Sequence, residues 1–129
     1  MYENLIKAIV EQSNIESLSE LKEFLEEIAI HGCASYAPYG FTYYSENVEF
    51  HAKHEDELWD ILHELSEDFG HPSIIDFIAS CNVHEVNSHA QLANAIVWIC
   101  LEHIASLYLN DAINFERDDD LADLFKVAS

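Results

Sequence analysis

The sequence predicts an all-α fold: a single domain over residues 1–129, built as a bundle of five or six helices with a structured aromatic loop. Half of the 129 residues are hydrophobic and 12% are aromatic, which is enough for one core. Only three Gly and two Pro are present, too few for a turn-dense β-sandwich. The hydrophobic residues also recur at the three- and four-residue spacing of helices.

Two helices are predicted in the N-terminal part. Residues 2–12 carry apolar side chains at positions 5, 6, 9 and 10, which share one face of a helix. A second helix follows Ser17, because Ser17 and Glu20 have the spacing of a capping box, and Gly32 supplies its stop. Its apolar face consists of Leu18, Leu21, Phe24, Leu25 and Ile28.

Residues 31–44 interrupt the helical pattern and concentrate aromatic side chains beside Gly and Pro. We expect a structured loop there, with a short extended piece near residues 41–44. A loop of this kind either packs on its own core or offers an aromatic surface to a partner. Its aromatic residues are Tyr36, Tyr39, Phe41, Tyr43 and Tyr44.

One long helix is predicted from Ser45, as its cap, to about Phe69, where Gly70 ends it. Pro72 suits the first turn of a shorter helix over residues 72–81. On the long helix, the apolar positions expected to face the core are Val48, Ala52, Leu58, Trp59, Leu62, Leu65 and Phe69.

The helix predicted from Ser88 to Leu109 is apolar on nearly all sides, and Ser88 and Gln91 repeat the capping-box spacing at its start. Glu102 and His103 interrupt the apolar run, so we interpret it as the central buried helix and not as a membrane span. Residues 110–129 are expected to form one more short helix after the acidic run at residues 118–120.

Net charge is the most unusual property of the chain. Twenty-five Asp and Glu against five Lys and Arg give a formal charge of −20. Such a protein is repelled by DNA, RNA and anionic membranes, so direct binding to any of these is not expected. It is attracted to basic protein surfaces. Plain solubility, or a proteome adapted to high salt, is the simpler explanation and stays open.

The charge is concentrated on the predicted helix 45–69. At about 100° per residue, six of its carboxylates fall within a sector of about 80°, interrupted only by Lys53. A helix surface suited to stability alone usually alternates Glu with Lys at i,i+4, whereas like charges at this spacing are unfavourable. The six residues, which we call the acidic row and predict to bind a partner, are Glu46, Glu49, Asp56, Asp60, Glu64 and Glu67.

A row of carboxylates about 5–6 Å apart on a rigid helix resembles the phosphates along a DNA strand to within a factor of two. We therefore expect the row to bind a surface that normally holds nucleic acid. A second row is available from the other acidic residues, Glu16, Glu20, Glu23, Glu26 and Glu27 with the group at residues 118–123.

Other chemistry has weaker signals. Asp60 with His63 has the i,i+3 spacing of some metal ligands, but both lie on one helix and no HExxH motif is present, so neither a metal nor another cofactor is expected. Cys33 beside His31, or Ser35, is a candidate nucleophile without a recognisable base and orienting group. No catalytic residue is therefore assigned, and the chain is not expected to be an enzyme.

The location expected from the sequence is the cytoplasm. The start, MYENLIKAIVEQ, lacks the basic and apolar regions of a signal peptide. Three widely spaced cysteines without a CxxC pair fit a reducing compartment.

The stretch HGCASYAPYGFTYYSENVEFHAKHEDELWDILHE resembles a small acidic protein family of unknown activity carried by phages and plasmids. The later IIDFIAS and the helix from Ser88 extend this resemblance over roughly residues 29–109. In size and charge the chain is also similar to the anti-CRISPR and anti-restriction proteins of phages that mimic DNA. These resemblances imply a mobile-element protein that evades host defence. They assign no catalytic residues to this chain.

Together these arguments predict an inhibitor of a host defence system, with CRISPR effector complexes first among the targets and restriction enzymes second. Its partner is a basic nucleic-acid-binding protein of the host, and a homodimer is left open. The competing hypothesis is an acidic helical adaptor or homo-oligomer that uses its aromatic loop. A metal-dependent enzyme on the Asp60–His63 pair is the third.

Overall fold

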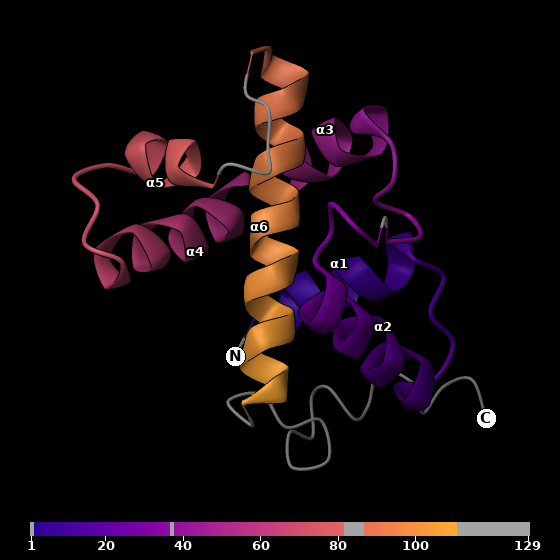
Figure 1. The fold of residues 1–129 in the computed structure, drawn as a ribbon. Coiled ribbons are helices and arrows are strands. Elements are labelled where there is room, and N and C mark those ends of the chain that lie inside the picture. Colours follow the sequence, from indigo (N-terminus) through magenta and orange to yellow (C-terminus); the bar gives the residue numbers. More distant parts are fainter. Residues whose placement is uncertain (1, 37, 82–86, 111–129) are drawn as a thin grey trace. The chain divides into compact units, whose positions relative to one another are not determined.

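The computed structural model describes residues 2–36, 38–81 and 87–110, and over these ranges the fold is all-α, with six helices and no strand (Figure 1). This confirms the predicted fold class. The helices are α1 (Glu3–Gln12), α2 (Leu18–His31), α3 (Tyr44–Lys53), α4 (Glu55–Asp68), α5 (Ile74–Ser80) and α6 (His89–Leu109). The tail helix predicted within residues 110–129 falls outside the described ranges except for Asn110.

The chain forms two compact units, and the boundaries between them fall after Gly40 and after Cys100. Unit 1 holds α1, α2 and the C-terminal half of α6, and unit 2 holds α3, α4, α5 and the N-terminal half of α6. The prediction of a single domain over residues 1–129 remains a prediction.

The starts of α2 and α6 follow the predicted capping boxes. The Ser17 hydroxyl accepts a hydrogen bond from the Glu20 backbone N–H at 3.2 Å, and Ser88 does the same for Gln91 at 3.1 Å. In both cases the side chain at the third helical position accepts a hydrogen bond from the backbone N–H of the residue before the cap. Glu20 thus accepts from the Glu16 N–H, and Gln91 accepts from the Asn87 N–H. Each box satisfies two backbone donors at a helix start.

In unit 1, α1 and α2 lie beside the C-terminal half of α6 (Figure 1). Leu5, Ile6 and Ile9 from α1 are almost fully buried, and four apolar residues of α2 are also buried: Leu21, Phe24, Leu25 and Ile28. The Glu102 carboxylate of α6 accepts a hydrogen bond from the Cys33 backbone N–H at 2.9 Å, just after α2 ends at Gly32. The predicted stop at Gly32, with φ of +75°, is confirmed.

In unit 2, side-chain hydrogen bonds connect the loop that precedes α3 with α6. The Asn47 amide is fully buried and donates both to the Phe41 carbonyl oxygen, at 2.9 Å, and to the Asn94 side chain. Trp98 donates its indole N–H to the same Phe41 carbonyl at 2.9 Å. The predicted extended piece at residues 41–44 is wrong, because Phe41–Tyr43 form bends without a strand and Tyr44 already begins α3.

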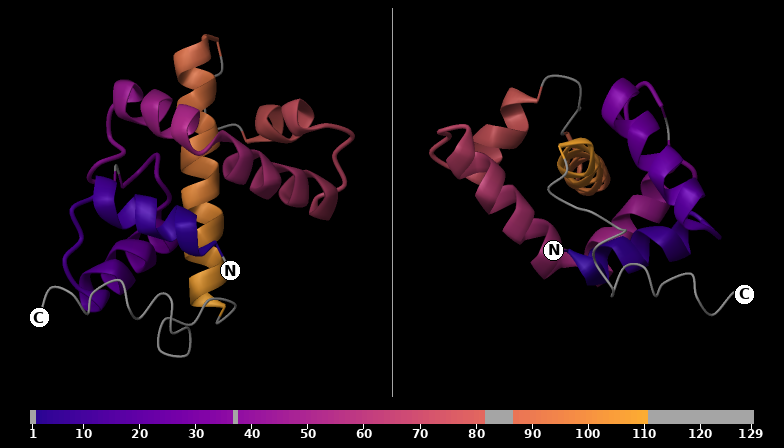
Figure 2. Two further views of the ribbon diagram at one scale, coloured as in Figure 1. Left: turned by 180° about the vertical axis from the view of Figure 1, so that it is seen from behind. Right: turned by 90° about the horizontal axis from the view of Figure 1, so that it is seen from below.

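The predicted long helix over residues 45–69 is also wrong, since the chain breaks at His54 into α3 and α4. The two helices leave His54 in different directions (Figure 2). His54 packs its ring on buried Phe50, with centroids 4.7 Å apart. The break places Glu55, Asp56 and Glu57 in the first turn of a new helix, where the helix dipole stabilises negative charge. In one continuous helix these charges would only repel each other.

Other predicted boundaries differ by smaller amounts. The N-cap of α3 is Tyr43 rather than Ser45, and Glu46 accepts a hydrogen bond from the Tyr43 N–H at 3.1 Å. Pro72 precedes α5 instead of lying in its first turn, because Ser73 is the cap and its hydroxyl accepts from the Asp76 N–H. The stop at Gly70, with φ of +72°, agrees with the prediction.

Helix α6 is the one helix in the described ranges that is long and apolar enough to span a membrane, a property that core helices of soluble proteins share. The polar Asn94 of α6 is buried, and so are nine hydrophobic side chains of this helix: Ala93, Ala95, Ile96, Val97, Ile99, Cys100, Leu101, Ile104 and Ala105.

Burial makes unit 2 sensitive to acid through His51. The His51 Nε2 atom is buried, with no hydrogen-bond partner among the described residues, and the ring lies edge-on to Trp59. Desolvation lowers the pKa of His51 below its ordinary 6.5, His89 lowers it further, and Glu55 partly opposes both.

We expect the free energy of unfolding to fall as the pH drops below about 6.5, because unfolded chains then bind a proton that folded His51 resists. Above that pH the contribution of His51 is fully present. His51→Gln should reduce this loss of stability, and His63→Gln, at an exposed position on α4, should not. Denaturant unfolding between pH 5 and 8 measures the difference. Equal acid sensitivity of the two variants would contradict this explanation.

Candidate functional site

Helix α4 separates its side chains into a buried and a charged face. Its buried residues are Leu58, Ile61, Leu62, Leu65 and Ser66. On the opposite side lie four exposed carboxylates, which we call the α4 row: Asp56, Asp60, Glu64 and Glu67. At about 100° per residue these four fall within a sector of about 80°.

The α4 row is one-signed and close to continuous. Successive members are four, four and three residues apart, so neighbouring carboxylates lie on adjacent turns of one helical face. Helix α4 carries no Lys or Arg, and its only other ionisable side chains are His63 and the carboxylates Glu55, Glu57 and Asp68. The row therefore cannot pair with a Lys or Arg of its own helix.

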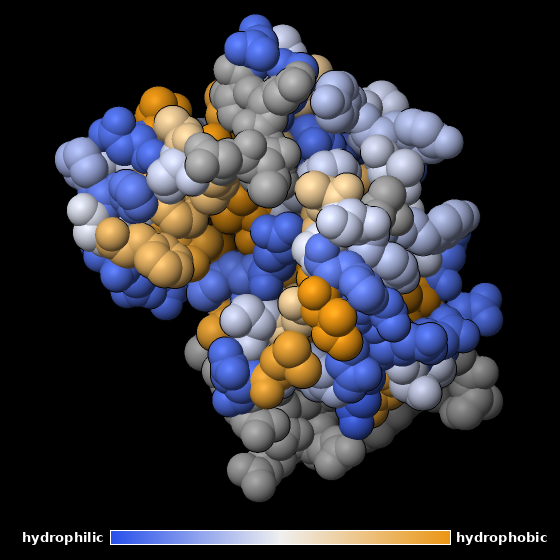
Figure 3. Space-filling model, in the orientation of Figure 1, coloured by the Kyte–Doolittle hydropathy of each residue, from blue (hydrophilic) through white to orange (hydrophobic). Residues whose placement is uncertain are grey.

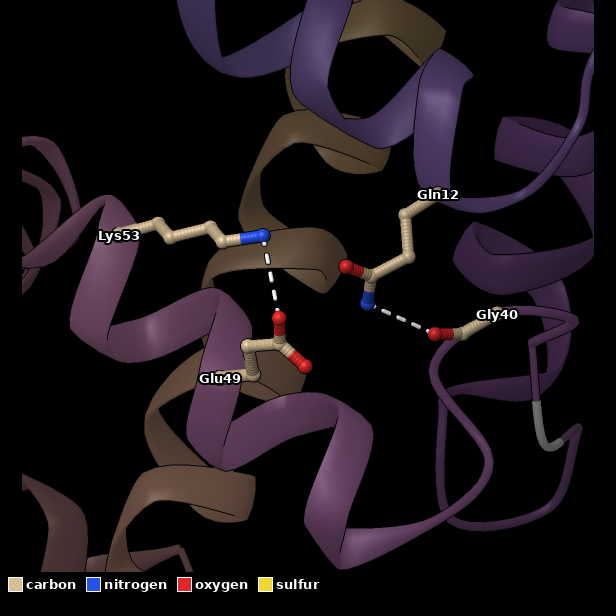
Figure 4. A network of polar contacts seen from close by, with 4 residues as sticks. All are labelled: Gln12, Gly40, Glu49 and Lys53. Carbon is tan, nitrogen blue, oxygen red and sulfur yellow. Dashed lines mark hydrogen bonds and ion pairs between the residues drawn. The ribbon is translucent and has the colours of Figure 1, made fainter.

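The remaining two members of the acidic row, Glu46 and Glu49, lie on α3 and not on α4. Glu46 is half-buried and caps the start of α3. Glu49 forms an ion pair with Lys53, one turn further along α3, at 3.2 Å (Figure 4). The break at His54 thus splits the predicted row of six, and only the four on α4 share a helical face.

The second row predicted on α2 belongs to unit 1, and several of its carboxylates make contacts within that unit. Glu20 accepts from the Glu16 N–H, Glu26 accepts from the Tyr108 hydroxyl at 3.4 Å, and Glu27 pairs with His31 at 3.3 Å. Lys22 lies close to Glu23 and Glu26, where they line a shallow surface hollow. The acidic group at residues 118–123 lies outside the described residues.

Residues 3–114 match a protein family described as a domain of unknown function, DUF7222. This match covers most of the chain. The chain belongs to the DUF7222 family. No curated protein matches it. No solved structure matches it either.

The family match includes all six helices, so both the α4 row and the aromatic loop lie inside the DUF7222 domain. The acidic run at residues 118–120 lies beyond it.

For metal binding, the DUF7222 domain shows no group of three or more His, Cys, Asp or Glu side chains able to hold an ion within residues 2–36, 38–81 and 87–110. Asp60 and His63 are both exposed on α4. Two other possible ligands in the sequence, His84 and Glu85, lie outside the described residues.

The predicted nucleophile Cys33 is in an environment that opposes reactivity. Its side chain is fully buried, and burial raises the pKa of the thiol well above its ordinary value. The neighbouring Glu102 carboxylate raises this pKa further. Because the thiolate is the reactive form, Cys33 is held in its unreactive form. Ser35, the other candidate, is exposed in the turn that follows.

The aromatic loop divides between core and surface. Phe41 is fully buried and meets Phe50 edge-on, with centroids 5.0 Å apart. Tyr39 in unit 1, and Tyr43 and Tyr44 in unit 2, remain exposed. The sequence pattern did not separate these two groups. It also missed exposed apolar residues on the α4–α5 hairpin, since Phe69 was expected in the core and is 67% exposed.

Proposed function

We propose that this protein is a stoichiometric inhibitor that binds a basic nucleic-acid-binding surface of another protein through the α4 row. The observation that carries the proposal is four exposed carboxylates of one sign on a single helical face, in a chain of net charge −20. A cationic groove that normally holds phosphates would receive this face, and Arg side chains in it would pair bidentately with the carboxylates.

The spacing supports mimicry of one nucleic-acid strand. From Asp56 to Glu67 the helix rises about 16 Å and presents four carboxylates, whereas one strand of B-DNA presents about five phosphates over that length. The α4 row is therefore only slightly sparser in charge than the strand it would replace. No direct contact with nucleic acid is needed for this mechanism.

The arrangement costs some helix stability, which favours a role beyond solubility. Asp56 with Asp60, and Asp60 with Glu64, are like charges one turn apart, and each such pair costs about 0.2–0.5 kcal/mol. An equally soluble helix could interleave Lys and gain a similar amount. The cost is offset if the carboxylates meet cations of a partner.

The partner class proposed first is a cytoplasmic host defence protein that binds nucleic acid, with CRISPR effector complexes before restriction enzymes. A competition assay tests this. Labelled duplex DNA is bound to each candidate, and the chain is titrated in at salt concentrations from about 50 to about 200 mM.

We expect release of DNA from at least one candidate, with an affinity that falls steeply as salt rises, because exposed ion pairs are screened. A pull-down from host lysate at low salt widens the search to other basic proteins. Absence of any salt-sensitive association with a nucleic-acid-binding protein would contradict the proposal.

A further inference from the structure

The hairpin of α4 and α5 exposes two large apolar side chains. Phe69 ends α4 and is 67% exposed, and Ile75 in the first turn of α5 is 59% exposed. In Figure 3, hydrophobic side chains over α4 and α5 form a patch bordered by hydrophilic ones. Isolated apolar residues on a surface are ordinary, but a contiguous patch marks an interaction site more often.

The exposed Phe69 ring is supported on one side by an aromatic contact. The Phe69 ring stacks on Phe77 of α5, with centroids 5.8 Å apart and planes 18° apart. Phe77 is only 6% exposed, and its ring also meets the His71 ring, with centroids 5.6 Å apart. The Ser80 hydroxyl lies 3.4 Å from the His71 Nε2 atom. Phe69 therefore presents one face of its ring from a fixed support, a favourable geometry for a contact anchor.

The hairpin that carries these apolar side chains is strongly acidic. Residues 55–81 contain no Lys or Arg. Their eight carboxylates are Glu55, Asp56, Glu57, Asp60, Glu64, Glu67, Asp68 and Asp76. Glu67, Asp68 and Asp76 are exposed and adjoin Phe69 and Ile75 in sequence. A partner that covers these apolar side chains must also approach the carboxylates beside them.

We infer that the α4–α5 hairpin docks a basic amphipathic segment of a protein, whose apolar residues cover Phe69 and Ile75 while its Lys and Arg pair with the carboxylates around them. Charge complementarity selects cations, and the apolar patch selects a segment that carries hydrophobic anchors between those cations. This inference rests on the proposed function and adds to it that charge alone does not complete the contact.

Two synthetic peptides distinguish docking on the apolar side chains from binding by charge alone. The first is a helical peptide with Leu along one face and Lys and Arg elsewhere, and the second has the same charge with every Leu replaced by Ser. Fluorescence anisotropy of each labelled peptide, titrated with the full chain, gives Kd. We expect the Leu peptide to bind at least about 10-fold more tightly, since two apolar side chains become covered.

Phe69→Ser/Ile75→Ser should remove that advantage and leave the binding of the Ser peptide within about 2-fold of the original. The matched control is Ile30→Ser, because Ile30 of α2 is 68% exposed in unit 1 and should have no effect on either peptide. Circular dichroism confirms that the variants fold, which their exposed positions favour.

The outcomes are distinguishable. Equal binding of both peptides, unchanged by Phe69→Ser/Ile75→Ser, would overturn the apolar docking site and leave the electrostatic proposal standing. The Leu peptide could also bind more tightly and lose that advantage as much in Ile30→Ser as in Phe69→Ser/Ile75→Ser. This result would place the contact outside the hairpin and would also overturn the apolar docking site. If neither peptide binds at low salt, both the docking site and the proposed function are wrong.

Discussion

Replacing Asp56, Asp60, Glu64 and Glu67 together by Asn and Gln is expected to weaken binding to the cationic partner by roughly 4- to 1,000-fold. Each exposed ion pair contributes about 0.2–1 kcal/mol, and four of them together account for this range. Most of the loss should appear in the association rate, because these charges steer the encounter. Stopped-flow or surface-based kinetics at low salt measure it, and the salt dependence should decrease in parallel.

Folding stability should stay within about 1 kcal/mol of the original chain, so a loss of binding cannot be attributed to unfolding. Neutralisation removes the like-charge steps along α4, each worth about 0.2–0.5 kcal/mol. It also removes the favourable charge of Asp56 in the first turn, worth about 0.3–1 kcal/mol. The two effects have opposite signs and similar size. Denaturant unfolding at constant pH checks the balance.

The matched control neutralises four carboxylates in unit 1, Glu11, Glu16, Glu23 and Glu26, which changes the net charge by the same amount. It should affect binding far less than the α4 variant if the α4 row makes the contact. Equal losses for both sets would show that only the total charge matters, and the assignment of the site to α4 would then be wrong.

Gly40→Ala is expected to destabilise the protein by about 2–4 kcal/mol, the largest effect on stability that we predict for a single small substitution. Gly40 has φ of +87°, which disfavours any side chain. An added Cβ would lie 2.8 Å from the Gln12 carbonyl carbon and closer still to its oxygen, so backbone would meet backbone. The Gln12 side chain also donates to the Gly40 carbonyl oxygen at 2.7 Å (Figure 4).

Gly70→Ala provides the comparison, since Gly70 also has positive φ, +72°, but nothing lies within 4 Å of the position its Cβ would take. Only the backbone strain remains, about 1–2 kcal/mol. Urea unfolding gives the free energy of unfolding of each variant. The difference between the two losses is the cost of the steric clash at Gly40 beyond backbone strain. If Gly70→Ala costs as much as Gly40→Ala, the close approach of the Gln12 backbone is not what makes Gly40 necessary.

Several features of this protein follow from the sequence by itself. Periodic apolar residues predict α1, α2 and α6, and the Ser17 and Ser88 capping boxes place two of their starts, because both signals act within one or two helical turns. The four carboxylates of the α4 row are also a local pattern. Their common face needs only the geometry of a helix, so these four still share a face on α4, whereas Glu46 and Glu49 of the predicted row lie on α3.

Only the tertiary structure decided where the predicted long helix breaks and which apolar residues stay exposed. Residues 45–69 have continuous helical periodicity, yet packing of His54 on buried Phe50 and the favourable acidic first turn of α4 outweigh one more turn of helix. Phe69 has the spacing of a core residue, but α5 presents only Phe77 to cover one side of its ring. Helical periodicity records which face a side chain is on, whereas burial depends on what the rest of the chain brings to that face.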